Sequence, residues 1–203
     1  MPPLAAGWCF LLDVDGTLLD HVADPRAVRV GPELRELLQR LLAATGGAVA
    51  LISGRSIADI DTLFAPLQLA VAGQHGIERR SADGSLYRQS PPLEHLALAA
   101  AELVRLTASH EGLVLENKGM TLALHYRMAP ALGELAGREM NRILAMLGEG
   151  FELLAGKFVC EIKPSGKDKG VAIAEFVAEA PFAGRLPVFI GDDLTDEHGF
   201  DLV

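Results

Sequence analysis

Aromatic residues and cysteines are scarce in this chain. Aromatic side chains make up 5% of the 203 residues, with one tryptophan and two tyrosines, too few for a platform on which carbohydrate rings could stack. The two cysteines, Cys9 and Cys160, both lie in apolar runs that are typical of strands. We therefore expect small buried side chains at these positions, rather than a disulfide or a nucleophile.

Basic residues and long apolar runs are scarce as well. Lys and Arg number 18 against 27 Asp and Glu, which gives a net charge of −9, so extensive binding of nucleic acid is excluded, although a small positive pocket is not. No apolar run approaches the about 20 residues that a membrane helix needs. The opening segment MPPLAAGW also lacks the basic segment and apolar core of a signal peptide. We expect a soluble, cytoplasmic protein with no membrane partner.

Strand and helix patterns alternate at both ends of the chain. Short apolar runs typical of strands lie at 8–14, 48–53, 69–73 and 186–193. Apolar residues at helical spacing lie at 33–44, 57–64 and 170–179. Strands that alternate with helices favour an α/β fold with a mostly parallel sheet covered on both faces.

The middle of the chain has a different order of elements. A helix over 91–110, two strands over 113–118 and 120–127, a second helix over 131–147 and a hairpin over 151–164 are predicted there. This order indicates a small α+β domain, 86–164, inserted into an α/β core formed by 1–85 and 165–203. No strand or helix follows the last acidic motif to close the sheet, so we expect a C-terminal piece to be missing.

Polar residues follow the predicted parallel strands where those strands end. They form the motifs DVDGT (13–17), SGR (53–55) and GDDLTDE (191–197), and Lys169 precedes the last helix. Because ligand sites in parallel α/β sheets form beyond the carboxyl ends of the strands, we expect these residues to meet. Asp13, Asp15 and Asp192 would supply hard oxygen ligands for Mg²⁺, and Lys169 with the metal would balance the paired aspartates.

The order of these motifs resembles the haloacid dehalogenase (HAD) superfamily of aspartate-dependent phosphatases, over the whole chain. Within it, the stretches GQHG (73–76), ENKGMTLALHYR (116–127), CEIKPSGKDKG (160–170) and GDDLTDE (191–197) resemble the trehalose-6-phosphate phosphatase family. The resemblance implies a Rossmannoid core with an α+β cap that determines specificity. It also implies Mg²⁺-dependent hydrolysis of trehalose 6-phosphate through an aspartyl-phosphate, and functional pairing with a trehalose-6-phosphate synthase.

The roles of the catalytic residues follow from this resemblance. Asp13 would be the nucleophile, and Asp15 would protonate the leaving sugar oxygen and then activate water. Lys169 would neutralise charge on the transferring phosphoryl group. The Mg²⁺ ligands would be the carboxylates of Asp13 and Asp192 and the carbonyl of Asp15. The phosphoryl oxygens would be bound by Ser53 and by backbone amides near Thr17 and Gly54.

The remaining acidic residues of the last motif have two possible roles. Asp193, Asp196 and Glu197 would either orient the metal ligands or Lys169, or cap the helix that follows. The sequence leaves both roles open.

Charged residues of the insert alternate along its predicted strands. Glu116 and Lys118 are two residues apart and would share one strand face, where an acid beside a base could bind sugar hydroxyls. Such a face could equally hold cross-strand ion pairs, which are commonly worth little. The resemblance favours substrate contacts for these two residues. Glu161 and Lys163, and likewise His125 and Arg127, are also two residues apart and would share a face, and these four are further candidate substrate contacts. His75 is another candidate and is also compatible with a structural turn.

Two rival functions are compatible with the motifs. The core motifs would serve equally in a phosphatase of another phosphosugar, such as sucrose phosphate or mannosyl-phosphoglycerate. A non-catalytic sensor of sugar phosphates could use the same fold, although Asp13, Asp15, Lys169 and Asp192 are all present, which favours an active enzyme.

Overall fold

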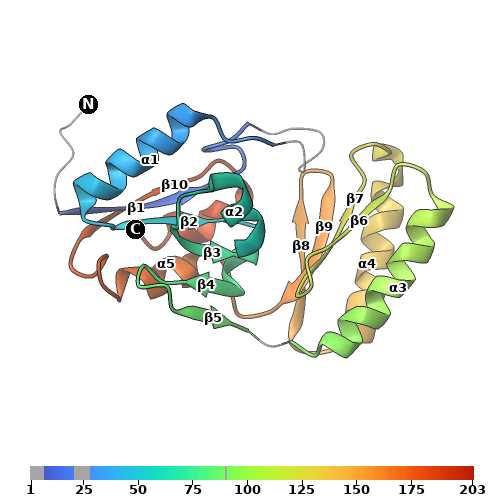
Figure 1. Ribbon diagram of the computed structural model, residues 1–203. Helices are drawn as coiled ribbons and strands as arrows, with labels where there is room; N and C mark the ends of the chain where they lie inside the picture. Colours follow the sequence, from blue (N-terminus) through green and yellow to red (C-terminus); the bar gives the residue numbers. More distant parts are fainter. Residues whose placement is uncertain (1–6, 21–27, 90) are drawn as a thin grey trace. The chain divides into compact units, whose positions relative to one another are not determined.

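The computed structural model describes residues 7–20, 28–89 and 91–203, and the chain forms two compact units (Figure 1). The first unit joins Met1–Arg88 to Lys167–Val203, and the second comprises Gln89–Gly166. The first six residues, on which the expectation about a signal peptide partly rests, lie outside the described residues. In the part of the chain that is described, no helix is long and apolar enough to cross a membrane.

The first unit is built on a sheet with the strand order β10-β1-β2-β3-β4-β5. Its parallel strands are β1 (Trp8–Asp13), β2 (Val49–Ile52), β3 (Ala70–Gly73) and β10 (Leu186–Ile190). β1, β2 and β3 are buried along almost their whole length, as parallel strands covered on both faces must be. The predicted α/β fold is confirmed.

Helices pack on both faces of this sheet. The cluster that contains Phe10 and Leu12 of β1 includes side chains of α1 (Pro32–Thr45) and α2 (Ile57–Phe64). The cluster that contains Cys9 and Leu11 includes side chains of α5 (Lys169–Val177). Successive residues of a strand point to opposite faces, so the two clusters lie on opposite sides of β1.

Both cysteines behave as small buried side chains. Cys9 belongs to the core of the first unit and Cys160 to that of the second, and neither forms a disulfide. Burial raises the pKa of both thiols, which makes them poor nucleophiles. The expectation drawn from their apolar surroundings is confirmed.

Two short antiparallel strands extend the sheet beyond β3 and were not predicted. They are β4 (Glu78–Arg80) and β5 (Leu86–Arg88). The sequence of β4 is entirely charged and has no strand-like alternation, but Arg79 finds partners in Glu175, 3.0 Å away, and Glu179, 2.6 Å away. Residues 86–88, assigned to the insert from the sequence, therefore belong to the sheet of the first unit.

The second unit is an antiparallel sheet with helices on one face. Its elements are α3 (Leu93–Ser109), β6 (Val114–Asn117), β7 (Leu122–His125), α4 (Gly133–Leu147), β8 (Phe151–Gly156) and β9 (Val159–Pro164). The strand order is β6-β7-β9-β8, and apolar residues of the sheet form one cluster with those of both helices. This is the predicted order of elements: helix, two strands, helix, hairpin.

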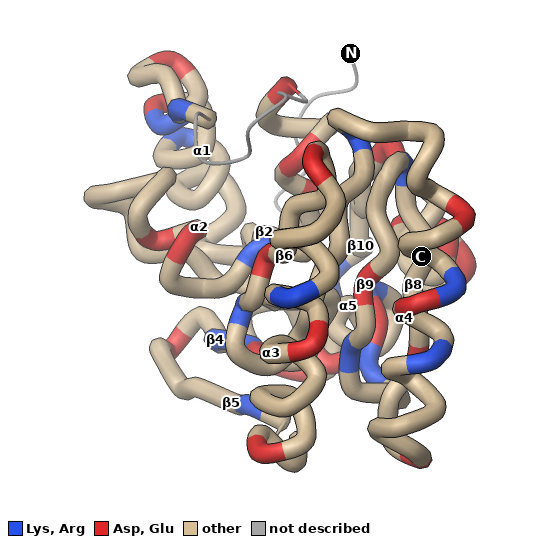
Figure 2. The backbone as a smooth tube through the Cα atoms, turned by 90° about the vertical axis from the view of Figure 1, so that its right-hand side faces the viewer, with Lys and Arg blue, Asp and Glu red and all other residues tan. Residues whose placement is uncertain are grey.

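The other face of this sheet carries charged side chains. Glu116 of β6 and Glu161 of β9 are both paired with Ala123 of β7, and Lys163 of β9 is paired with Glu152 of β8. Figure 2 marks the acidic and basic positions along the backbone. Directly paired residues of neighbouring strands lie on the same face, so these side chains form one surface, called the polar face below.

Candidate active site

Asp13 is a buried carboxylate at the end of β1. It is 4% exposed, and its Oδ1 accepts a hydrogen bond of 2.8 Å from Nζ of Lys169. The same ammonium group donates to Oδ1 of Asp196 at 2.7 Å. Lys169 is the first residue of α5, where Asp168 caps the helix by accepting from the backbone N–H of Val171. The helix start thus fixes the lysine between two buried carboxylates.

Burial and charge act in opposite directions on this triad. The pKa of Asp13 is raised to about 6, because burial raises it more than the nearby Lys169 lowers it. For Lys169, burial works against the charged form, but Asp13 and Asp196 together raise the pKa of its ammonium group above the usual value. The lysine therefore stays charged, as a group that stabilises negative charge must be.

The acidic motif after β10 folds into a short 3₁₀ turn, Leu194–Asp196, followed by α6, Glu197–Phe200. Asp193 caps this turn through Thr195, and Asp196 completes the capping box. Burial would raise the pKa of Asp193, but its hydrogen bonds with Thr195 outweigh burial and lower it. Asp193 is thus a capping residue, while Asp196 both caps and binds the lysine, so the two roles left open by the sequence coincide at Asp196.

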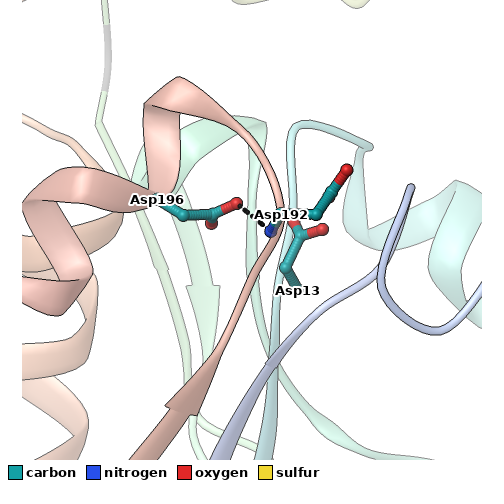
Figure 3. A group of neighbouring side chains, drawn as sticks. All are labelled: Asp13, Asp192 and Asp196. Atoms are coloured by element: carbon teal, nitrogen blue, oxygen red, sulfur yellow. Dashed lines mark hydrogen bonds between the residues drawn. The ribbon is translucent and has the colours of Figure 1, made fainter.

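Three carboxylates lie close enough together to bind a cation. Asp13, Asp192 and Asp196 each place an oxygen within 4.8 Å of the others, and Figure 3 shows these three side chains. Asp196 already accepts from Lys169 on Oδ1 and from the backbone N–H groups of Asp192 and Asp193 on Oδ2. Asp13 and Asp192 are therefore the better candidates for ligands, and carboxylate oxygens suit a hard divalent cation.

The backbone at Gly16 provides the space that the Asp192 carboxylate occupies. Gly16 has a φ of +100°, and a Cβ atom there would lie 2.2 Å from Oδ2 of Asp192. We predict that Gly16→Ala displaces this carboxylate and weakens binding of a divalent cation by about 10- to 100-fold, the usual cost of disturbing a metal ligand's support. Calorimetric titration with Mg²⁺ measures the change.

Gly84→Ala is the matched control for this substitution. Gly84 has a similar φ of +90°, but a Cβ atom there would meet nothing within 4 Å. Both variants carry the same kind of backbone strain, so the control removes the effect of strain alone from the comparison. Equal Mg²⁺ affinities for the two variants would contradict this assignment of Asp192.

The SGR loop, Ser53–Arg55, follows β2 and contains the predicted phosphate ligands. Ser53 is 1% exposed, and its Oγ accepts from the backbone N–H of Arg55 at 3.1 Å. Across the described residues, the buried Oγ1 of Thr17 has no hydrogen-bond partner. A buried hydroxyl without a partner is costly unless a ligand satisfies it, which favours the predicted phosphate site between the ends of β1 and β2.

His75 packs against the SGR loop. It is 8% exposed and lies in a turn in which Gln74 and His75 both have positive φ, 48° and 58°. A Cβ atom on Gly54 would lie 2.9 Å from Nε2 of His75, and the backbone N–H of His75 donates to the carbonyl of Ser53. These contacts favour the structural role, and a substrate contact for His75 stays a prediction.

The carboxylate of Asp15 is bound by a partner that the sequence did not single out. Nε of Arg55 donates to Oδ2 of Asp15 at 2.7 Å, and Nη2 donates to Oδ1 at 2.6 Å. Asp13 and Ile52 are the last paired residues of β1 and β2. Asp15 follows Asp13 by two residues and the SGR loop follows Ile52 directly, so the two motifs meet at neighbouring strand ends. The bidentate pair could have been suspected only from that adjacency.

On the polar face of the second unit, most of the predicted substrate residues form ion pairs. His125 and Glu116 are 2.9 Å apart across β6 and β7, and the hydrogen bond with His125 lowers the pKa of Glu116. Lys118 donates to Oε1 of Glu161 at 3.1 Å, and Thr121 donates to the same oxygen at 2.7 Å. Glu116 thus has a partner across the paired strands, whereas Glu161 is bound from the turn that joins β6 to β7.

The two remaining candidates of the insert differ in their surroundings. Lys163 is 3% exposed and pairs with Glu152 on the polar face. Arg127 lies in the turn after β7, which ends at His125, and its guanidinium is 5.9 Å from the ring centre of Phe158. Because the strand stops before Arg127, the two-residue spacing from His125 does not place it on the polar face.

Comparison with known proteins points to one family. A family model described as trehalose-phosphatase matches residues 11–203. A probable trehalose-phosphate phosphatase of Sinorhizobium fredii is 42% identical over 196 residues, 97% of this chain and 74% of the relative. The trehalose-6-phosphate phosphatase of Escherichia coli is 44% identical over 206 residues, 100% of this chain and 76% of the relative.

Solved structures agree with this result. The C-terminal domain of the trehalose-6-phosphate phosphatase of Candida albicans has a TM-score of 0.84 and 25% identity, covering 96% of this chain and 72% of that chain. A HAD phosphatase from Bacteroides thetaiotaomicron has a TM-score of 0.57 at 17% identity, with 97% and 81% covered, and it supports the fold alone. This chain belongs to the trehalose-phosphatase family.

Proposed function

We propose that this chain is a phosphatase that hydrolyses trehalose 6-phosphate to trehalose and inorganic phosphate. The observation that carries the proposal is the buried triad of Asp13, Lys169 and Asp196, with Asp192 beside it. The relatives named above are called trehalose-phosphate phosphatases, and phosphatases of this superfamily share aspartyl-phosphate chemistry.

The first half of the reaction would transfer the phosphoryl group to Asp13. Lys169 holds Oδ1 of Asp13, which leaves Oδ2 as the attacking atom. As Oδ2 bonds to phosphorus, the bond from phosphorus to the sugar oxygen breaks, and that oxygen takes the electron pair and a proton from Asp15. Lys169 would offset charge on the transferring group, which is the main demand of phosphoryl transfer.

The second half would release phosphate. A water molecule attacks phosphorus, its proton passes to Asp15, and the bond from phosphorus to Asp13 breaks with its electron pair returning to the carboxylate. Asp13 and Asp15 are thereby restored to their starting states. Ser53 and the unpartnered hydroxyl of Thr17, together with the backbone at Gly54, would bind the phosphoryl oxygens in both halves.

The HAD fold implies a divalent metal, and we propose Mg²⁺. The carboxylates of Asp13 and Asp192 and the carbonyl of Asp15 would hold it. The carboxylate cluster fits such an ion, and Gly16 leaves the space in which the Asp192 carboxylate joins that cluster. When bound, it would neutralise part of the phosphate charge.

The second unit would act as the cap that selects the sugar, and its polar face would supply the contacts. Glu116, with His125 as neighbour, is the leading candidate for a sugar ligand. We predict that Glu116→Ala lowers kcat/KM for trehalose 6-phosphate by about 10- to 100-fold, because a charged hydrogen bond to a hydroxyl is lost. Turnover of p-nitrophenyl phosphate, which has no sugar, should change by less than about threefold.

Glu102→Ala is the control for this prediction, since Glu102 is an acid of the same unit that pairs with Arg142 at 2.6 Å on α3 and α4. Both activities should survive in it. Equal losses on the two substrates in Glu116→Ala would contradict the recognition role.

Rival substrates would be separated by the same kind of assay. A panel of sugar phosphates compares trehalose 6-phosphate with sucrose 6-phosphate and mannosyl-phosphoglycerate. A sensor would bind without releasing phosphate. The functional pairing with a synthase that produces trehalose 6-phosphate, and the cytoplasmic location, stay predictions.

A further inference from the structure

The side chain of Arg55 forms two parallel hydrogen bonds with Asp15, the proposed acid and base. The pairs are Nε to Oδ2 at 2.7 Å and Nη2 to Oδ1 at 2.6 Å, and the two side chains are 14% and 33% exposed. A guanidinium bound in this way fixes the plane of the carboxylate as well as its position.

The backbone of Arg55 is itself held on two sides. Its N–H donates to Oγ of Ser53 at 3.1 Å, and its carbonyl accepts from the N–H of Gln74 at 2.8 Å. A Cβ atom on Gly73 would lie 2.9 Å from the same carbonyl, so the chain there passes close to the SGR loop. Arg55 therefore extends from a braced loop, next to the strand end that carries Asp15.

Asp15 lies in a turn whose backbone is closed by hydrogen bonds from the N–H groups of Leu18 and Leu19 to the carbonyl of Val14, so Arg55 supports the side chain of Asp15. It comes two residues after Asp13, the last residue of β1, and Gly16 follows it with a positive φ. A carboxylate side chain in a turn has several rotamers open to it, and an error of about 1 Å in a catalytic group can cost about 100-fold in rate.

We propose that Arg55 is a positioning residue that orients the carboxylate of Asp15 for proton transfer, an inference that rests on the proposed function. The two bonds use one lone pair on each carboxylate oxygen, and a carboxylate offers about four such sites. The unused sites can receive the proton of the attacking water while phosphorus bonds to the water oxygen and its bond to Asp13 breaks. In the first half, they can present the proton to the sugar oxygen that leaves.

The test compares substrates whose leaving groups differ in their need for a proton. p-Nitrophenolate can leave without being protonated, whereas a sugar alkoxide needs a proton in order to leave. With both substrates, the second half of the reaction is the same hydrolysis of phospho-Asp13. In Arg55→Gln with p-nitrophenyl phosphate, we expect a burst of about one nitrophenolate per enzyme at the wild-type rate. Steady turnover should then be about 100-fold slower than in the wild type. With trehalose 6-phosphate, Arg55→Gln should have a kcat about as low, no initial burst of trehalose, and a KM close to that of the wild type.

Arg80→Gln is the matched control, because Arg80 also binds a carboxylate through two bonds, to Asp61 at 2.8 and 2.6 Å, and is also 14% exposed. It should keep wild-type kinetics. A KM raised at least tenfold with unchanged kcat in Arg55→Gln would make Arg55 a phosphate ligand instead, and overturn the inference. Unchanged kinetics would overturn it too. If the wild type itself releases no phosphate, the proposed function fails, a result distinct from either.

Discussion

Asp13→Asn is expected to abolish release of phosphate from trehalose 6-phosphate, by roughly 10⁴-fold or more. The amide has the shape of the carboxylate but cannot attack phosphorus, and its weaker donor strength as a metal ligand adds to the loss. Measuring phosphate release over hours, with enough enzyme to detect slow turnover, gives an upper limit for the residual activity of the variant. Activity within tenfold of the wild type would exclude Asp13 as the nucleophile.

Measuring the free energy of unfolding of Asp13→Asn would show whether the inactive variant is still folded. Asp13 has its pKa raised to about 6 in the folded protein, against an ordinary value of 3.8, so its ionisation disfavours folding. In metal-free protein, the wild type should therefore lose stability relative to Asp13→Asn as the pH rises from 3.8 to about 6, and the difference should stay constant above that. Urea unfolding of both proteins across this range checks the sign.

Lys169→Met is expected to destabilise the folded protein strongly. Lys169 is 4% exposed and is the shared partner of Asp13 and Asp196, so methionine leaves two buried carboxylates close together without a cation. Breaking a buried ion pair from one side costs about 3–5 kcal/mol, which urea unfolding of the metal-free protein would detect. Activity should fall as well, because the charge that offsets the phosphoryl group is lost.

Adding a second substitution to Lys169→Met shows whether the loss of stability comes from the unpaired carboxylates or from the lost packing of the lysine side chain. Lys169→Met with Asp13→Asn carries one buried carboxylate fewer, so it should recover part of the lost stability while remaining inactive. If the double variant were no more stable than Lys169→Met, lost packing of the lysine side chain would account for the effect, contrary to the electrostatic explanation.

The sequence predicted the parallel sheet well because parallel strands leave a strong local signal. β1 and β2 are continuous apolar runs, each ending in the polar residues of a site. β4 was missed for the opposite reason: Glu78 and Arg79 are charged, and the partners of Arg79, Glu175 and Glu179, lie far along the chain. No local pattern can reveal a strand whose charges are satisfied by distant residues.

In the candidate site, the motifs identified the residues but not their contacts. Asp196 was recognised only as an acid with two possible roles, and its bond to Lys169 depends on how α5 packs beside the turn after β10. The pair of Arg55 with Asp15 likewise depends on the register between β1 and β2. Partners of this kind are fixed by tertiary structure, which a single sequence does not contain.

The polar face of the second unit shows the limit of spacing arguments. Residues two apart share a face only while the strand lasts, and β7 ends at His125, before Arg127. The cross-strand register then determines that Glu116 meets His125. Lys118, one residue beyond the end of β6, reaches Glu161 from the turn that joins β6 to β7. The sequence indicated a charged face, but these pairs required the paired strands.

The most direct test of the proposed function is release of inorganic phosphate from trehalose 6-phosphate. The purified chain would be assayed with Mg²⁺, with excess EDTA, and as Asp13→Asn, beside sucrose 6-phosphate and mannosyl-phosphoglycerate at equal concentration. We predict rapid release from trehalose 6-phosphate that EDTA and Asp13→Asn both abolish, and much slower release from the other two sugars. A folded chain that releases no phosphate, or that prefers another phosphosugar, would contradict the proposed function.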